Sequence, residues 1–151
     1  MIIIAHRGNI DGRIPAEENK PEYIQKALDM GFDVEVDVWL TKGGWYLGHD
    51  SPSYKIDKKV LMNPRVWCHA KNVFTLFALL KNGMHCFFHQ TDDVTLTSKG
   101  FMWAFNRCKP TPKSIVLFPE DGGIDINTCD ICAGVCTDEP ARMRELLCVA
   151  K

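Results

Sequence analysis

The residues with the clearest chemistry form three small groups in the first third of the chain. They are His6-Arg7-Gly8, Glu35-Val36-Asp37 and His49-Asp50. Each group lies at, or directly after, the end of a short apolar run that is typical of a β-strand. Together they supply two imidazoles, an arginine and two carboxylates. These are the groups needed to cleave a phosphodiester, because the reaction requires an acid, a base and positive charge at the phosphate.

The two histidines are candidates for an acid/base pair. One group must remove a proton from the attacking hydroxyl, and a second must protonate the leaving alkoxide. Imidazoles titrate near neutrality, so His6 and His49 can perform both tasks. Each histidine could instead cap a strand or bond a loop carbonyl, but the paired arrangement favours catalysis. Asp50 would either orient His49 or begin a turn.

The acidic pair is a candidate metal site. Glu35 and Asp37 are two residues apart on an expected strand, so both side chains point to the same face. Two adjacent carboxylates repel each other unless a cation lies between them, and their hard oxygen ligands suit Mg²⁺ or Ca²⁺. The alternative is a polar layer neutralised by Lys or Arg. Arg7 and Lys71 would then pair with these carboxylates rather than bind phosphate oxygens.

These side chains must be positioned by alternating strands and helices. Such alternation favours parallel strands with right-handed crossovers, and polar groups gather at the carboxyl ends of the strands. The expected strands are Ile2–Ala5, Asp33–Leu40, Trp45–Gly48, Val66–His69, Cys86–His89, Phe101–Phe105, Ile115–Phe118 and Ala133–Cys136. The expected helices are Pro21–Met30, Val73–Lys81 and Pro140–Val149, and residues 51–63 should be irregular or weakly helical.

Composition indicates one domain over residues 1–151, because 46% hydrophobic and 25% charged residues support an ordinary core. A net charge of −1 argues against binding a nucleic-acid duplex through a broad basic surface. No apolar run approaches the ~18 residues of a membrane span, and the N-terminus lacks the features of a signal peptide. With seven cysteines, an odd number, we expect reduced thiols and a cytoplasmic location. The Cys129, Cys132 and Cys136 cluster lacks a fourth zinc ligand, so packing thiols are expected there.

The segments IIIAHRG and AEENKPEYIQKALDMGFDVEVDVWLTKGGWYLGHD resemble the glycerophosphodiester phosphodiesterase family, within the wider group of phosphatidylinositol-phospholipase-C-like phosphodiesterases. The shared order is a strand ending in His-Arg-Gly, a Glu-Asn loop, an acidic strand and His-Asp after a hairpin. The later GVCTDEPARMREL resembles the family's closing Thr-Asp-x-Pro turn. The resemblance implies a (β/α)₈ barrel, which typically needs ~250 residues. We therefore expect a compact, pared-down TIM-type (β/α) barrel with short or missing helices and seven or eight strands.

The resemblance also implies roles for single residues. His6 and His49 correspond to the family's acid/base pair, and Glu35 and Asp37 to its metal ligands. The chain departs from the family at His69, where the family carries the third carboxylate of the metal site. Because imidazole is a softer ligand that favours transition metals, the choice between Mg²⁺ and Ca²⁺, and the need for a metal, stay open.

Several residues are candidates for a wider pocket. Glu18 in the Glu-Asn loop and Glu120 at a later strand end are substitute oxygen donors, and His69 could contact phosphate instead. His89 and Trp103 could line the pocket, although a buried core histidine and a packing tryptophan are the favoured interpretations.

Three functions are consistent with these residues. The first is a metal-dependent phosphodiesterase acting on a small phosphodiester such as a glycerophosphodiester, with water or a substrate hydroxyl as nucleophile. The second is metal-independent phospholipase-C-like chemistry, in which Arg7 and Lys71 replace the metal. The third is a catalytically inactive domain that binds a phosphate ligand.

Overall fold

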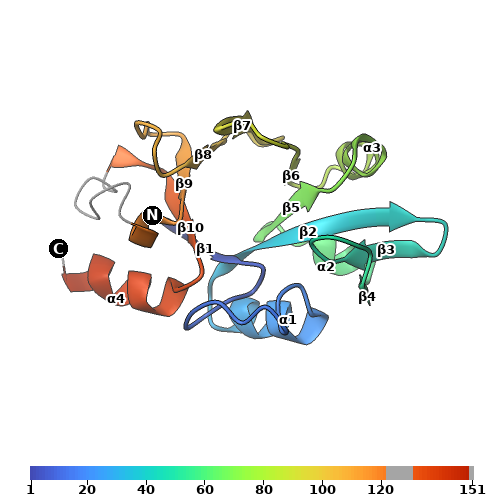
Figure 1. The fold of residues 1–151 in the computed structure, drawn as a ribbon, viewed down its shortest axis with the longest axis horizontal. Helices are drawn as coiled ribbons and strands as arrows, with labels where there is room; N and C mark the ends of the chain where they lie inside the picture. The colour runs from blue at the N-terminus through green and yellow to red at the C-terminus, as the bar shows by residue number, and fades with distance from the viewer. Residues whose placement is uncertain (122–130, 150–151) are drawn as a thin grey trace.

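A single ten-stranded sheet forms the body of the protein and curls into a half-barrel (Figure 1). The structure is a computed structural model that describes residues 1–121 and 131–149. Its strands are β1 Ile2–His6, β2 Asp33–Thr41, β3 Gly44–Leu47, β4 Tyr54–Lys55, β5 Val66–Ala70, β6 Cys86–Phe87, β7 Val94–Leu96, β8 Met102–Phe105, β9 Ser114–Leu117 and β10 Gly134–Thr137. Its helices are α1 Pro21–Asp29, α2 Lys58–Leu61, α3 Val73–Lys81 and α4 Pro140–Val149, with a short 3₁₀ helix η1 at Pro119–Asp121.

The curled part of the sheet runs in the order β6-β5-β2-β1-β10-β9-β8-β7. Neighbours from β6 to β8 are parallel, whereas β7 is antiparallel to β8, and β3 and β4 extend from β2 as an antiparallel ribbon. The pairing of adjacent strands stops between β6 and β7, so the sheet does not close into a ring. There the Ser98 N–H donates to the Cys86 carbonyl at 2.8 Å, and the Thr95 hydroxyl donates to the Phe88 carbonyl at 3.0 Å.

The predicted TIM-type barrel is therefore wrong. Such a barrel is a closed ring of parallel strands, each followed by a helix, whereas this sheet is open and mixed and carries four short helices in the described residues. Segment lengths explain the difference. Only residues 97–101 separate β7 from β8. A parallel connection needs a dozen or more residues, so β7 must return antiparallel.

The two faces of the sheet carry different side chains because successive residues of a strand point in opposite directions. On β2, Val34, Val36 and Val38 join the core cluster that includes residues of α1. Glu35 and Asp37 alternate with them and therefore face the inside of the curl. The strands and helices expected from the sequence largely match those of the structure, and α3 and α4 have the predicted bounds. None of the helices in the described ranges has both the length and the apolar character to cross a bilayer.

Candidate active site

A cavity of 590 Å³ lies where the strands of the curled sheet end. It is bounded by residues at or just beyond the carboxyl ends of β1, β5, β8, β9 and β10. The predicted site residues that line it are His6, Arg7, Glu35, His49, His69, Lys71, His89 and Trp103. Asp37 lies directly behind this wall and is fully buried. The structure thus brings most of the predicted chemistry around one hollow.

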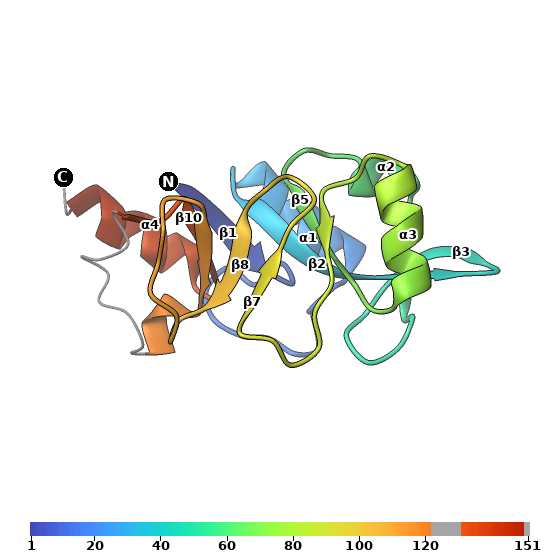
Figure 2. The same cartoon turned by 90° about the horizontal axis from the view of Figure 1, so that it is seen from above.

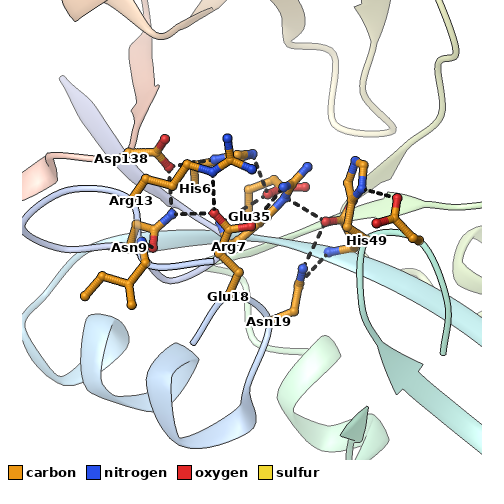
Figure 3. A network of polar contacts seen from close by, with 12 residues as sticks. His6, Arg7, Asn9, Arg13, Glu18, Asn19, Glu35, His49 and Asp138 are labelled. Carbon is orange, nitrogen blue, oxygen red and sulfur yellow. Dashed lines mark hydrogen bonds and ion pairs between the residues drawn. The ribbon is translucent and has the colours of Figure 1, made fainter. Parts of the chain in front are cut away.

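His6 is fixed by a carboxylate from the far end of the chain (Figure 3). Its Nδ1 donates to Asp138 Oδ1 at 2.7 Å, and its Nε2 lies 4.0 Å from Glu35 Oε2. The ring also meets the edge of Phe118, with 4.9 Å between centroids. Burial lowers the pKa of His6, but the hydrogen bond to Asp138 and the charge of Glu35 outweigh it, so the pKa is raised. His6 is therefore oriented and prepared to carry a proton.

Asp37 is surrounded by donors and cations. Its Oδ2 accepts from the Asn19 side-chain amide at 3.0 Å and lies 2.9 Å from Arg7 Nε. Its Oδ1 accepts from Lys71 Nζ at 3.1 Å and lies 3.2 Å from His69 Nδ1. Burial alone would raise the pKa of Asp37, but these neighbours hold it well below its usual range. Asp37 is consequently a permanent negative charge beneath the cavity.

Glu35 has far fewer hydrogen-bond donors and cations around it than Asp37, although it is only 2% exposed. It accepts one hydrogen bond in the described residues, from the Arg7 backbone N–H at 3.3 Å. Its carboxylate lies 3.8 Å from His69 Nδ1, too far for a hydrogen bond. Burial, together with the charge of Asp37, raises the pKa of Glu35. A buried carboxylate with so few donors calls for a further positive partner.

The donor set at this point fits a divalent cation. Glu35, Asp37 and His69 each offer one ligand atom, and these atoms lie within 4.8 Å of one another. Two carboxylate oxygens with one imidazole nitrogen form a mixed hard and intermediate set that several divalent metals accept. The under-bonded Glu35 is the observation that favours an ion over a purely protein-paired arrangement.

Arg7 is held in place before any ligand arrives. Its backbone is left-handed, with φ of 51°, a conformation that costs of order 1 kcal/mol or more for a non-glycine residue. Its Nη1 donates to Glu18 Oε2 at 3.0 Å, and Glu18 also accepts from Asn9 and Arg13. Burial raises the pKa of Glu18, but these three donors lower it overall. Glu18 therefore anchors Arg7, and its oxygens are occupied by protein groups.

His49 lies at the exposed rim, on the turn after β3. Its side chain is 47% exposed, and its Nδ1 donates to the highly exposed Asp50 at 2.6 Å. The turn depends on Gly48, whose φ is 144°; a Cβ there would lie 2.2 Å from the Ser51 carbonyl oxygen. The Trp39 indole N–H donates to the Gly48 carbonyl at 2.7 Å. Sequence and packing thus fix the backbone that presents His49 to the cavity.

Two further predicted residues, His89 and Trp103, belong to the wall of the cavity. His89 stacks on His69 with 4.7 Å between centroids, and burial lowers the pKa of His89 to about 4. Its Nδ1 is buried with no hydrogen-bond partner in the described residues. Trp103 is 4% exposed and stacks on Phe87 at 4.4 Å. Both residues pack in the wall and also line the cavity.

Glu120 lies away from the acidic pair. Its Oε1 accepts from the Thr137 hydroxyl at 2.6 Å and from the Asp138 backbone N–H at 3.3 Å. It therefore supports the segment that carries Asp138, and it is absent from the group of described residues that could hold a metal.

Sequence reasoning missed four residues of this network. They are Asn9, Arg13, Asn19 and Asp138. The sequence did indicate Asp138 as a site residue, because Thr137-Asp138 follows an apolar strand, as the other polar groups do. Asn19 was indicated by its place in the Glu-Asn loop, whereas nothing in the sequence indicated Asn9 or Arg13. Of the cysteine cluster, Cys129 lies outside the described residues, and Cys132 and Cys136 are buried.

Comparisons with protein-family models, curated proteins and solved structures found no match to this chain. Function must therefore be argued from the residues around the cavity.

Proposed function

We propose that the protein is a phosphodiesterase that cleaves a small phosphodiester, such as a glycerophosphodiester. The observation that carries this proposal is the convergence, on one 590 Å³ cavity, of an oriented His6, a second histidine and the Glu35, Arg7 and Lys71 side chains. A phosphodiester monoanion needs positive charge at its oxygens and a proton for its leaving group. The residues that line this cavity can supply both.

The two histidines take complementary roles. His6, whose pKa is raised, carries the proton that passes to the leaving alkoxide oxygen as the phosphorus–oxygen bond breaks. His49, at the exposed rim, takes the proton from the attacking water or substrate hydroxyl as its oxygen bonds to phosphorus. The roles reverse when the enzyme is reset or when a cyclic intermediate is opened.

Arg7 and Lys71 bind the phosphate oxygens of the substrate in this proposal. Buried Arg7 Nε has no hydrogen-bond partner in the described residues, although it lies 2.9 Å from Asp37 as an ion pair. The Arg7 side chain as a whole is 13% exposed and lines the cavity, so its guanidinium places a positive charge beside an arriving phosphate. Lys71 is 14% exposed and provides a second, compact charge on the other side of Asp37.

Glu35, Asp37 and His69 would hold a divalent cation such as Mg²⁺ or Ca²⁺. When bound, the cation would polarise the phosphate and stabilise the negative charge that develops on its oxygens. The rival is a metal-independent phosphodiesterase. It is favoured by the contacts of Arg7 and Lys71 with the two oxygens of Asp37, because these two cations already neutralise that carboxylate.

A cytoplasmic location is part of the proposal. Cys68 and Cys86 are register partners on adjacent strands, both buried and both free thiols. Neighbouring reduced thiols suit a reducing compartment.

Hydrolysis of bis(p-nitrophenyl) phosphate tests the proposal. We expect His6→Ala and His49→Ala each to lower kcat by about 10²-fold or more. The control Gln90→Ala, an exposed residue that also lines the cavity, should retain most activity. EDTA should abolish activity, and Mg²⁺ or Ca²⁺ should restore it. Undiminished activity in EDTA would select the metal-independent rival. Wild-type protein no faster than His49→Ala would leave only a phosphate-binding domain.

A further inference from the structure

The outer face of α3 is an apolar surface with no neighbour in the described residues. Its members recur at helical spacing and cover an arc of about 120°, at about 100° per residue. This α3 stripe consists of Val73, Phe74, Phe77 and Leu80, whose side chains are 66%, 65%, 62% and 50% exposed. The opposite face, with Thr75 and Leu79, is buried against the sheet. The stripe is therefore an additional apolar face on a helix that is already docked.

The fold explains why the stripe is uncovered. In β/α architectures a helix after each strand packs beside the preceding helix. Here β6 leads through residues 88–93 directly to β7, and no helix follows it in the described chain. Two phenylalanines, a valine and a leucine at these exposures present on the order of 400 Å² of apolar surface, the size at which a patch is often functional.

The same end of the molecule is strongly basic. Residues 42–81 contain seven Lys or Arg and two Asp, a net charge of +5, whereas the rest of the chain carries −6. The elements β3, β4, α2 and α3 of this segment lie together at one end in both views (Figures 1 and 2). Its exposed lysines are Lys42, Lys55, Lys58, Lys59 and Lys81. A net charge of −1 for the whole chain conceals this asymmetry.

We propose that the α3 stripe, together with the exposed lysines at the same end of the molecule, docks the protein on an anionic lipid surface. Apolar side chains that insert among head groups, flanked by lysines that meet anionic lipids, are the two features such docking requires. A second copy fits less well. Pairing through this face would bring two +5 ends together, and about 400 Å² is half of what each partner buries in a standard interface.

Docking would place the cavity close to the head groups. The first residue of the stripe, Val73, is two residues after Lys71, which lines the cavity. The docking itself stands apart from catalysis, because it depends on the outer face of α3 and on exposed lysines rather than on the histidines. It can therefore be tested by binding alone.

Co-sedimentation of the full chain with vesicles tests the proposal. We expect binding to phosphatidylcholine vesicles containing 30% phosphatidylserine and little binding to pure phosphatidylcholine. Phe74→Ser combined with Phe77→Ser should weaken binding at least tenfold. Serine has a helix propensity close to that of phenylalanine, so α3 should persist. Leu96→Ser, which removes an equally exposed apolar residue from β7, is the matched control and should leave binding unchanged.

A charge test completes the design. Lys58→Glu with Lys59→Glu should weaken binding by about 25-fold or more, since each basic residue near an anionic surface contributes about a fivefold effect. Lys26→Glu with Lys109→Glu makes the same change in net charge outside the basic segment and should have little effect. Circular dichroism checks the fold of each variant. Absent binding, equal binding to both vesicle types, or unaffected stripe variants would overturn the proposal. So would a dimer in sedimentation velocity that Phe77→Ser dissociates.

Discussion

Replacing Asp138 by Asn should reveal whether its charge holds a proton on His6. The two side chains meet at 2.7 Å and are only 17% and 13% exposed, so water screens the pair weakly. Asparagine keeps the size of the side chain and an oxygen that can accept from Nδ1, but it removes the negative charge. The pKa of His6, which burial lowers and Asp138 raises, should therefore fall in the variant.

The stability cost follows from the same contact. A hydrogen bond between charged partners contributes about 1.5–3 kcal/mol, and the variant should lose up to that amount of unfolding free energy. The pKa of His6 is raised in the folded state, so its contribution is complete below 6.5 and disappears as the pH rises through the folded value. The pKa of Asp138 is lowered, so its contribution is lost as the pH falls below 3.8. The loss of unfolding free energy in Asp138→Asn should therefore be largest between pH 3.8 and pH 6.5.

Urea denaturation at pH 5 and pH 9 measures this deficit, and NMR titration of the His6 ring follows its pKa. Asp50→Asn is the matched control, because Asp50 makes a similar contact with His49 at 2.6 Å but is 92% exposed. We expect little change in stability from that control. A deficit for Asp138→Asn that is equal at both pH values, or an unshifted His6 titration, would refute the reasoning.

Three further results are expected from the packing. Leu79→Ala, at a fully buried position, should cost about 2–5 kcal/mol in urea denaturation, and Leu80→Ala, at a half-exposed position, much less. Gly48→Ala should cost about 1–3 kcal/mol in the same assay and reduce phosphodiester hydrolysis, since its Cβ would lie 2.2 Å from the Ser51 carbonyl oxygen. Burial lowers the pKa of His85 from 6.5 to about 4, so stability should fall as the pH decreases through this range, by up to about 3 kcal/mol. Denaturation of His85→Asn at several pH values should show a shallower decline.

Local patterns predicted the individual elements well. The alternation of valines with Glu35 and Asp37 determines both the strand β2 and the face on which the carboxylates lie. The bounds of α3 follow from capping, since the Asn72 side chain accepts from the Thr75 N–H and the helix ends at Asn82. These signals arise from neighbouring residues and need no knowledge of the rest of the fold.

The arrangement of elements that are far apart in the chain was harder to predict from the sequence. Asp138 is 132 residues from His6, and only the parallel pairing of β1 with β10 brings them together. The open sheet was missed because β7 is three residues long with no distinctive pattern, and because the family resemblance implied a closed barrel. Which strands pair, and whether a ring closes, depends on connection lengths across the whole chain.

The imidazole at position 69 affects the charge of the group that it forms with Glu35 and Asp37. Arg7 and Lys71 both contact Asp37, whereas the only hydrogen bond to Glu35 in the described residues comes from the Arg7 backbone N–H. His69→Glu would add a third buried negative charge at the position that now lies 3.2 Å from Asp37. A phosphodiester anion would then be repelled unless a divalent cation were bound.

We therefore expect His69→Glu to reach half of its maximal activity at a lower Mg²⁺ concentration than wild type, and to unfold at lower urea concentration when the metal is absent. His69→Gln, which adds no charge, is the control and should show no such gain in Mg²⁺ affinity. If His69→Glu needed as much Mg²⁺ as wild type for half-maximal hydrolysis of bis(p-nitrophenyl) phosphate, the charge at this position would have no part in binding the cation. The case for Glu35, Asp37 and residue 69 as one electrostatic unit would then fail.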